Sequence, residues 1–167
     1  MRKRPHASLK WAGWLPGEST DPWHNHIPED LKGLTPDMIG ILIVSHGAFG
    51  ESLIHSASHV LGKRPLFLRQ LGVTVHDDPE AILPVAEDLI RFLDQGGGVL
   101  VLTDIYGATP SNIATRLLRP GRVEGIAGVN LPMLIRALTY REEPLESVLA
   151  KALEGATEGV LRMAQGG

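Results

Sequence analysis

From Met38 onward, the chain alternates between short apolar runs and segments whose apolar residues recur at helical spacing. Two of the apolar runs, residues 39–44 and 99–103, are nearly continuous, as is typical of strands covered on both faces. The segments between the runs carry apolar stripes of helical period. The pattern predicts strands at residues 39–44, 65–71, 99–103 and 123–129, and helices at residues 50–61, 79–94, 109–118, 131–140 and 144–163.

This order of strands and helices predicts a single α/β domain. Alternation of the two elements favours a doubly wound, mostly parallel sheet flanked by helices on both faces. Local signals support the expected helix starts, because Asp78 and Asn130 are good N-cap residues and Pro79 suits a first helical turn. In such sheets ligands bind beyond the carboxyl ends of the strands. Residues that directly follow a strand are therefore the candidates for chemistry.

Residues 1–37 differ from the rest of the chain. They hold all three tryptophans and five prolines, and they show no helical or alternating period. We expect a disordered tail, or a mis-assigned start with Met38 as the true first residue, and we place the domain at residues 38–165. His24 and His26 in this segment are weak evidence for a metal site, so we interpret them as surface residues.

Composition excludes several classes of protein. The 167 residues carry a formal net charge of −3, which gives no electrostatic basis for nucleic-acid binding. The chain has no cysteine, which excludes thiol chemistry and is compatible with a reducing compartment. No apolar run approaches the length of a membrane helix, and no signal-peptide core follows the basic N-terminus. We expect a cytoplasmic protein that is not embedded in a membrane.

His46 is the first candidate for chemistry. It follows the first strand directly, and Gly47 after it allows a sharp turn and leaves room for a bound phosphoryl group. The next helix begins within a few residues, so its free N–H groups and positive dipole end would stabilise an anion on the imidazole. A loop histidine that only forms a hydrogen bond explains the position equally well.

Asp104 and the segment after it complete the candidate site. A carboxylate beside an imidazole fixes its tautomer and leaves the other ring nitrogen free to attack. Gly107 and Thr109 predict a phosphate cradle at the start of a helix, with the Thr109 hydroxyl as a donor or as the N-cap. The alternatives are a turn aspartate and an ordinary helix start. No Gly-Lys-Ser/Thr pattern follows, so nucleoside triphosphate binding is not supported.

The other histidines are weaker candidates. His55 and His59 are four residues apart on one expected helix, but no third ligand is evident, so we interpret them as surface residues. His76 follows the second strand and could border the site, although a turn before the Asp78 cap explains it as well. We expect no metal and no cofactor.

Three segments resemble the mannose-family enzyme IIA component of the bacterial sugar phosphotransferase system. They read IGILIVSHGAFGESL, GVLVLTDIYGATPSNIA and IAGVNLPMLIRAL, in the family's order and spacing, and the similarity covers roughly residues 38–163. The resemblance implies a doubly wound α/β fold and a homodimer in which an edge strand is exchanged. It also implies that His46 accepts a phosphoryl group from the phosphocarrier protein HPr and passes it to enzyme IIB.

The resemblance assigns roles to further residues. Asp104 matches the aspartate that hydrogen-bonds the family's histidine, and Thr109 matches a serine in the family's Gly-Gly-Ser-Pro segment. Ala108 replaces the second glycine of that segment, and Tyr106 replaces a tryptophan found in some members. These departures leave the chemistry intact and put partner preference in question.

Three other functions remain alternatives at this stage. The phosphotransferase subunit of a dihydroxyacetone kinase is related, but Gly47 after the histidine argues against it. A regulatory sensor of phosphorylation state, in an incomplete system without a sugar permease, would share the same site. A small chelatase also places His-Gly after a first strand, but it needs a second metal ligand, for which only His76 is available.

Overall fold

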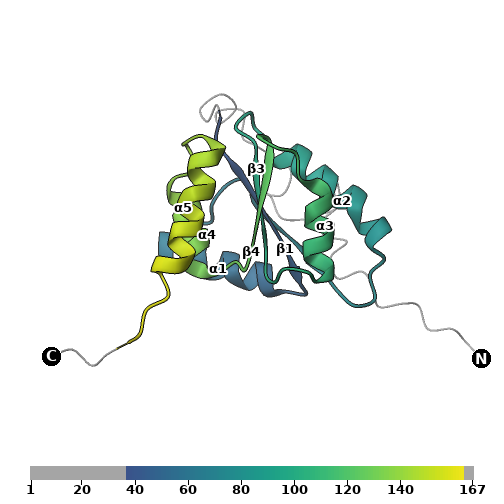
Figure 1. Cartoon of the computed structure of the whole chain (residues 1–167), viewed down its shortest axis with the longest axis horizontal. Coiled ribbons are helices and arrows are strands. Elements are labelled where there is room, and N and C mark those ends of the chain that lie inside the picture. The colour runs from purple at the N-terminus through teal and green to yellow at the C-terminus, as the bar shows by residue number, and fades with distance from the viewer. Residues whose placement is uncertain (1–36, 164–167) are drawn as a thin grey trace, which may run out of the picture. The chain divides into compact units, whose positions relative to one another are not determined.

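Four parallel strands form the centre of the domain, in the order β2-β1-β3-β4 (Figure 1). The computed structural model describes residues 37–163. The strands are β1 (Gly40–His46), β2 (Leu68–Val73), β3 (Val99–Thr103) and β4 (Val123–Ala127). Because β1 lies between β2 and β3, the end of the first strand has a neighbour on each side.

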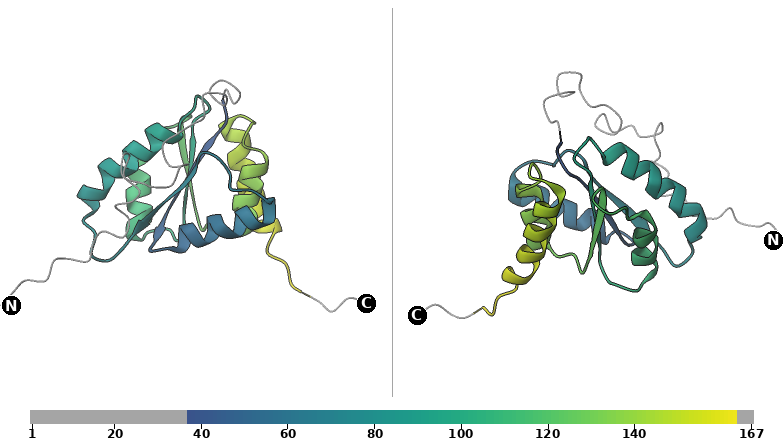
Figure 2. Two further views of the ribbon diagram at one scale, coloured as in Figure 1. Left: turned by 180° about the vertical axis from the view of Figure 1, so that it is seen from behind. Right: turned by 45° about the horizontal axis from the view of Figure 1, so that its top comes forward.

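Helices cover both faces of this sheet, which confirms the predicted doubly wound α/β architecture. On one face, side chains of α1 (Phe49–Leu61), α4 (Leu131–Thr139) and α5 (Leu145–Glu158) join one apolar cluster with the strands. On the other face lie α2 (Pro79–Leu93) and α3 (Thr109–Leu117). Figure 2 shows the same two helical layers from behind and with the top of the molecule tilted toward the viewer.

The predicted helix starts are confirmed at two caps. The side chain of Asp78 accepts a hydrogen bond from the Glu80 N–H at 3.0 Å, and that of Asn130 accepts one from the Met133 N–H at 2.9 Å. At α3 the N-cap is Ala108, which offers no side-chain cap, and Thr109 is the first helical residue. Of the two roles expected for the Thr109 hydroxyl, the N-cap is therefore wrong, because Thr109 already lies inside the helix.

Most element boundaries lie within two residues of the expectation, and two differ by more. The second strand begins at Leu68 rather than at residue 65, because Pro65 has no N–H for the ladder and Phe67 adopts a left-handed φ of 49°. The last helix ends at Glu158 rather than near Met163. Gly159, which directly follows Glu158, is a poor helix former. The expectations for the tail, including those for His24 and His26, concern residues outside the described part of the chain.

Arg141 connects the segments that precede β1 and β2, at the edge of the sheet opposite the carboxyl ends of the strands. Its guanidinium donates to the carbonyl of Leu66 at 2.7 Å and to that of Ile39 at 3.0 Å. Burial lowers the pKa of Arg141 to about 10, so the group stays charged at neutral pH.

No helix among residues 37–163 is long and apolar enough to cross a membrane.

Candidate functional site

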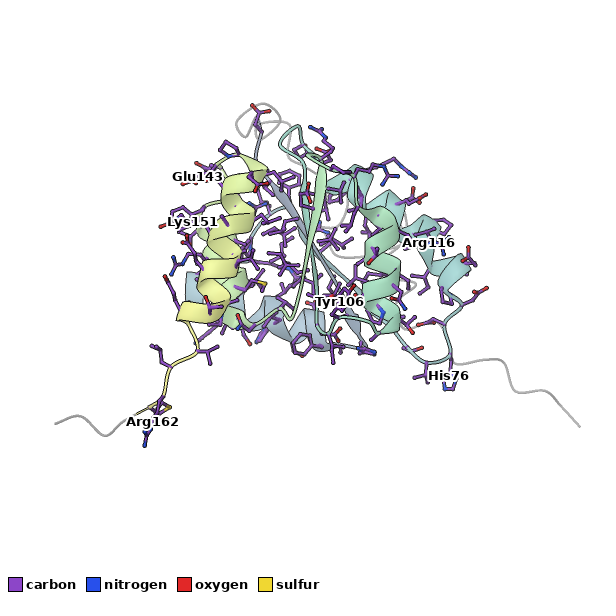
Figure 3. All side chains as sticks on the ribbon, viewed as in Figure 1. His76, Tyr106, Arg116, Glu143, Lys151 and Arg162 are labelled. Carbon is purple, nitrogen blue, oxygen red and sulfur yellow. The ribbon has the colours of Figure 1, made fainter. Side chains whose placement is uncertain are left out.

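The candidate site lies where β1 and β3 end side by side. Val44 of β1 pairs with Thr103 of β3, so the residues that follow these two positions emerge at the same edge of the sheet. Tyr106, which follows β3 closely, marks this edge at the foot of the sheet in Figure 3. The register therefore brings His46 and Asp104 together although they are 58 residues apart in the chain.

The imidazole of His46 is hydrogen-bonded to the carboxylate of Asp104. The distance between Nδ1 and Oδ2 is 2.7 Å, and the backbone N–H of His46 donates to the same oxygen at 2.9 Å. Because an ionised carboxylate only accepts hydrogen bonds, Nδ1 carries the hydrogen and Nε2 keeps its lone pair in the neutral ring. The arrangement thus presents Nε2 as a nucleophile or as a base.

The surroundings of Asp104 keep its carboxyl group ionised. Partial burial by itself would raise the pKa of Asp104, but hydrogen bonds from the His46 N–H, the His46 ring and the Ile105 N–H outweigh it and lower the pKa. Its side chain is 15% exposed, whereas that of His46 is 51% exposed. The carboxylate is therefore held inside the site while the imidazole stays accessible to a partner molecule.

Two glycines with left-handed backbone flank the pair. Gly47 has a φ of 50° and Gly107 a φ of 84°, and the space beside each, where a side chain would be, is open. Glycine is needed at both positions for the backbone angle rather than for lack of room. The N–H of Gly47 donates to the carbonyl of Val73 at 3.0 Å, which ties the turn after His46 to β2.

Thr109 and Gly107 lie at the same sheet edge as the histidine. Among the described residues, no hydrogen bond joins either of them to His46. Thr109 is exposed at the start of α3, where the first N–H groups of a helix lack partners within the helix. Pro110 follows it and has no N–H, so Thr109 and Ser111 provide the amides of this first turn.

Ser45 belongs to the site but was not singled out by the sequence reasoning. It is fully buried, and its Oγ accepts the Gly50 N–H in the first turn of α1 at 3.0 Å. This bond fixes the start of α1 against the end of β1. The signal in the sequence was a hydroxyl residue closing an otherwise apolar run.

The three other histidines in the described part of the chain are exposed. His55 and His59 lie on the surface of α1, as expected, and His76 lies in the loop after β2. No cluster of three or more metal-ligating side chains occurs within residues 37–163. Figure 3 places His76 well to the side of Tyr106 in that view.

The fold and this edge define a doubly wound α/β protein with a carboxylate-oriented histidine at the carboxyl end of its first strand. The sequence profile of the EIIA-man family, described as "PTS system fructose IIA component", matches residues 40–153. The chain belongs to this family of phosphotransferase-system components, as the resemblance implied.

Two relatives are about a third identical to this chain over the residues that align. The mannose-specific EIIAB component of Escherichia coli K12 is 32% identical over 125 residues, which are 73% of this chain and 38% of that protein. The fructose-specific EIIA component of Bacillus subtilis 168 is 31% identical over 109 residues, covering 63% of this chain and 72% of the relative. The chain thus matches well under half the length of the E. coli protein.

Solved structures share the fold. A phosphotransferase system component EIIA from Streptococcus agalactiae superposes with a TM-score of 0.67 at 24% identity, covering 75% of this chain and 97% of its own. A mannose/sorbose-specific IIA subunit from Enterococcus faecalis gives a TM-score of 0.68 at 21% identity, covering 78% and 98%. At these identities the comparison supports the α/β architecture alone.

Proposed function

We propose that this chain is a phosphoryl carrier of a sugar phosphotransferase system. His46 accepts a phosphoryl group from phospho-HPr and passes it to an enzyme IIB partner for carbohydrate uptake. The observation that carries this proposal is the 2.7 Å contact between His46 Nδ1 and Asp104 Oδ2, which leaves Nε2 free to attack. Membership of the EIIA-man family supports it.

The reaction exchanges one phosphorus–nitrogen bond for another. The Nε2 lone pair of His46 attacks the phosphorus in line, and the bond to the donor's imidazole breaks, its electron pair returning to that nitrogen. The ring of His46 becomes cationic while it carries the phosphoryl group, and the Asp104 carboxylate stabilises that charge. The exchange balances without a nucleotide, metal or redox cofactor.

The glycine turns and the helix starts would hold the phosphoryl oxygens. Amides in the first turns of α1 and α3 carry partial positive charge, and the open space beside Gly47 and Gly107 leaves room for the group. The Thr109 hydroxyl adds a donor at the start of α3. Positioning and electrostatic stabilisation of this kind are the main requirements of phosphoryl transfer.

A direct test is phosphorylation of the purified protein with phosphoenolpyruvate, enzyme I and HPr. We expect one phosphoryl group per chain, located on His46 by mass spectrometry under non-acidic conditions. Addition of an enzyme IIB should then discharge it. Labelling of another residue, or none, would refute the proposal, whereas labelling with no transfer to any IIB would favour a regulatory sensor instead.

The surface around His46 has the properties of a protein-docking site. Four large apolar side chains are exposed at this edge, at the start of α1 and in the loops after β2 and β3: Phe49, Val75, Ile105 and Tyr106. The segments 45–52, 73–80, 104–112 and 128–132 carry five carboxylates and no lysine or arginine. Glu51 pairs with Arg64 and Glu80 pairs with Arg116, which leaves Asp77 and Asp78 to make one side of this surface acidic. An apolar centre with such an acidic side fits a phosphorylated protein partner with a basic surface.

Tyr106→Ser should weaken docking of HPr without disturbing the fold. Its side chain is 83% exposed, so its removal leaves the core intact. Loss of one aromatic anchor should raise KM for phospho-HPr about 10-fold with kcat little changed. Val60→Ser, on an exposed position of α1, is the matched control and should leave KM unchanged. An unaltered KM in Tyr106→Ser would remove this residue from the docking surface.

The homodimer implied by the resemblance has two features in its support. In the described part of the chain, β4 pairs with β3 on one side, and on its other side only Val123 bridges to Arg119. After α5, residues 160–163 leave the body of the domain (Figure 1), with Val160, Leu161 and Met163 strongly exposed. We propose that this segment of one copy pairs with the β4 edge of the other.

Replacing Val160, Leu161 and Met163 together with serine should therefore give monomers. Light scattering after size-exclusion chromatography should report a dimer for the native chain and half that mass for the variant, because the apolar strand no longer covers the β4 edge. Leu153→Ser, at an exposed position of α5, should remain dimeric. A native monomer, or a dimeric triple variant, would contradict the arrangement.

The proposed partners also set the expected place of action. HPr and enzyme IIB meet the protein in the cytoplasm, so we propose a cytoplasmic protein whose phosphotransfer domain spans residues 38–165. The two relatives are named as mannose-specific and fructose-specific components, which favours carbohydrate uptake over a purely regulatory role.

A further inference from the structure

Gly72 lies next to the turn that follows His46. It belongs to β2 and pairs with Ser45 in the register of the sheet, one position before the pair of Val73 and His46. Its backbone is ordinary, with a φ outside the left-handed range, so nothing in its own conformation requires glycine. The reason for glycine must therefore come from its neighbours.

The neighbour is the backbone of Gly47. A Cβ on residue 72 would lie 2.2 Å from the carbonyl oxygen of Gly47 and 3.2 Å from its carbonyl carbon. Real Cβ atoms essentially never approach closer than 3.0 Å, so the turn would have to move by roughly 0.8 Å. Because the obstacle is backbone rather than a flexible side chain, no rotamer change can relieve the contact.

The same turn is held at three other points. The Gly47 N–H donates to Val73, the His46 N–H donates to Asp104, and the Gly50 N–H donates to Ser45 Oγ. These bonds connect the turn to β2, to β3 and to its own helix. A displacement of Gly47 is therefore passed to His46, whose backbone directly precedes it.

We propose that Gly72 is a positioning residue for His46: by lacking a side chain, it lets the Gly47 carbonyl rest against β2 and so fixes the imidazole against Asp104. This inference rests on the proposed function for its kinetic consequence. The geometry of the ring can be measured without any phosphotransfer.

The test compares Gly72→Ala with Gly125→Ala. Gly125 is also a glycine of a parallel strand, but a Cβ there would meet Leu118 Cδ2 at 2.9 Å, the end of a side chain that can turn away. We expect Gly72→Ala to slow phosphorylation about 10- to 100-fold, in line with the cost of misplacing a reacting group by about 1 Å. KM for phospho-HPr should change little, since the docking surface is intact.

Nitrogen-15 NMR of the His46 ring supplies the second measurement. In the native chain and in Gly125→Ala the hydrogen should stay on Nδ1, whereas Gly72→Ala should show a mixture of the two neutral tautomers. Unchanged ring spectra in a folded Gly72→Ala protein would overturn the proposal, as would failure of this variant to fold at any temperature, which would make Gly72 a general packing residue. If the native chain is not phosphorylated, the proposed function fails while the ring spectra still decide the role of Gly72.

Discussion

Replacing His46 with alanine should abolish phosphorylation by phosphoenolpyruvate, enzyme I and HPr. Alanine removes the only nitrogen that the site presents as a nucleophile, so transfer should fall below detection rather than merely slow. The substitution should have little effect on stability, because the side chain is 51% exposed and packs in no core. Intact-mass analysis should find no added phosphoryl group on the variant.

The controls for this experiment are His76→Ala and His55→Ala. Both histidines are exposed and lie outside the hydrogen-bonded pair. Each control should accept one phosphoryl group at the native rate. Undiminished labelling of His46→Ala would show that another residue carries the group, and lost labelling in His76→Ala would extend the site to the loop after β2.

Replacing Asp104 with asparagine should leave His46 in place but slow its phosphorylation strongly. The amide is close to the carboxylate in size, and its oxygen can still accept the backbone N–H of His46. It cannot stabilise the cationic phosphorylated ring, and it can donate to the ring and favour the wrong tautomer. We expect transfer to slow by about 10²- to 10⁴-fold, the contribution typical of a positioned acid–base group, with the upper end corresponding to a histidine that loses its orienting carboxylate.

A rapid-quench assay with phospho-HPr in excess would measure this change. Asp77→Asn is a suitable control because Asp77 is also a loop aspartate at this edge, bound to the Thr74 N–H rather than to a histidine. Native rates in Asp104→Asn would mean that the 2.7 Å contact has no role in the reaction. Loss in both variants would point to the charge of the whole edge instead.

Asp104 also predicts how stability depends on acid. The pKa of Asp104 is lowered in the folded protein from its ordinary value of 3.8. The ionised carboxylate therefore contributes its full stabilisation of the fold at pH values above 3.8. This contribution is lost as the pH falls from that value through the lowered one. The gap in unfolding free energy between the native chain and Asp104→Asn should therefore narrow with acid, as urea titrations at several pH values would measure.

The architecture could be predicted from the sequence because its signals are local. Apolar runs, helical stripes and the caps at Asp78 and Asn130 each depend on a few neighbouring residues. The meeting of His46 and Asp104 followed from one further rule, that parallel strands end at one edge. The end of the last helix was misjudged, because the apolar pattern continues past Gly159 while the helix does not.

The roles of Gly72 and Ser45 in positioning His46 could not be predicted from local sequence patterns. Which residue of β2 lies against Gly47 depends on the strand order and on the pairing of Ser45 with Gly72. A solitary glycine inside a strand does signal a close backbone approach, but the sequence does not say what approaches it. The role of Ser45 likewise depends on where the first turn of α1 lies.

The central place of β1 in the sheet links the proposed activity to the order of folding. His46 is synthesised before β2 and β3. Its hydrogen bond to Asp104 spans 58 residues, and the turn after it is hydrogen-bonded to β2. Contacts between such distant segments form late and slowly in parallel sheets. A chain released before β3 has joined β1 would hold the histidine but not its aspartate, so recovery of phosphate acceptance during refolding would report completion of the sheet rather than collapse of the chain.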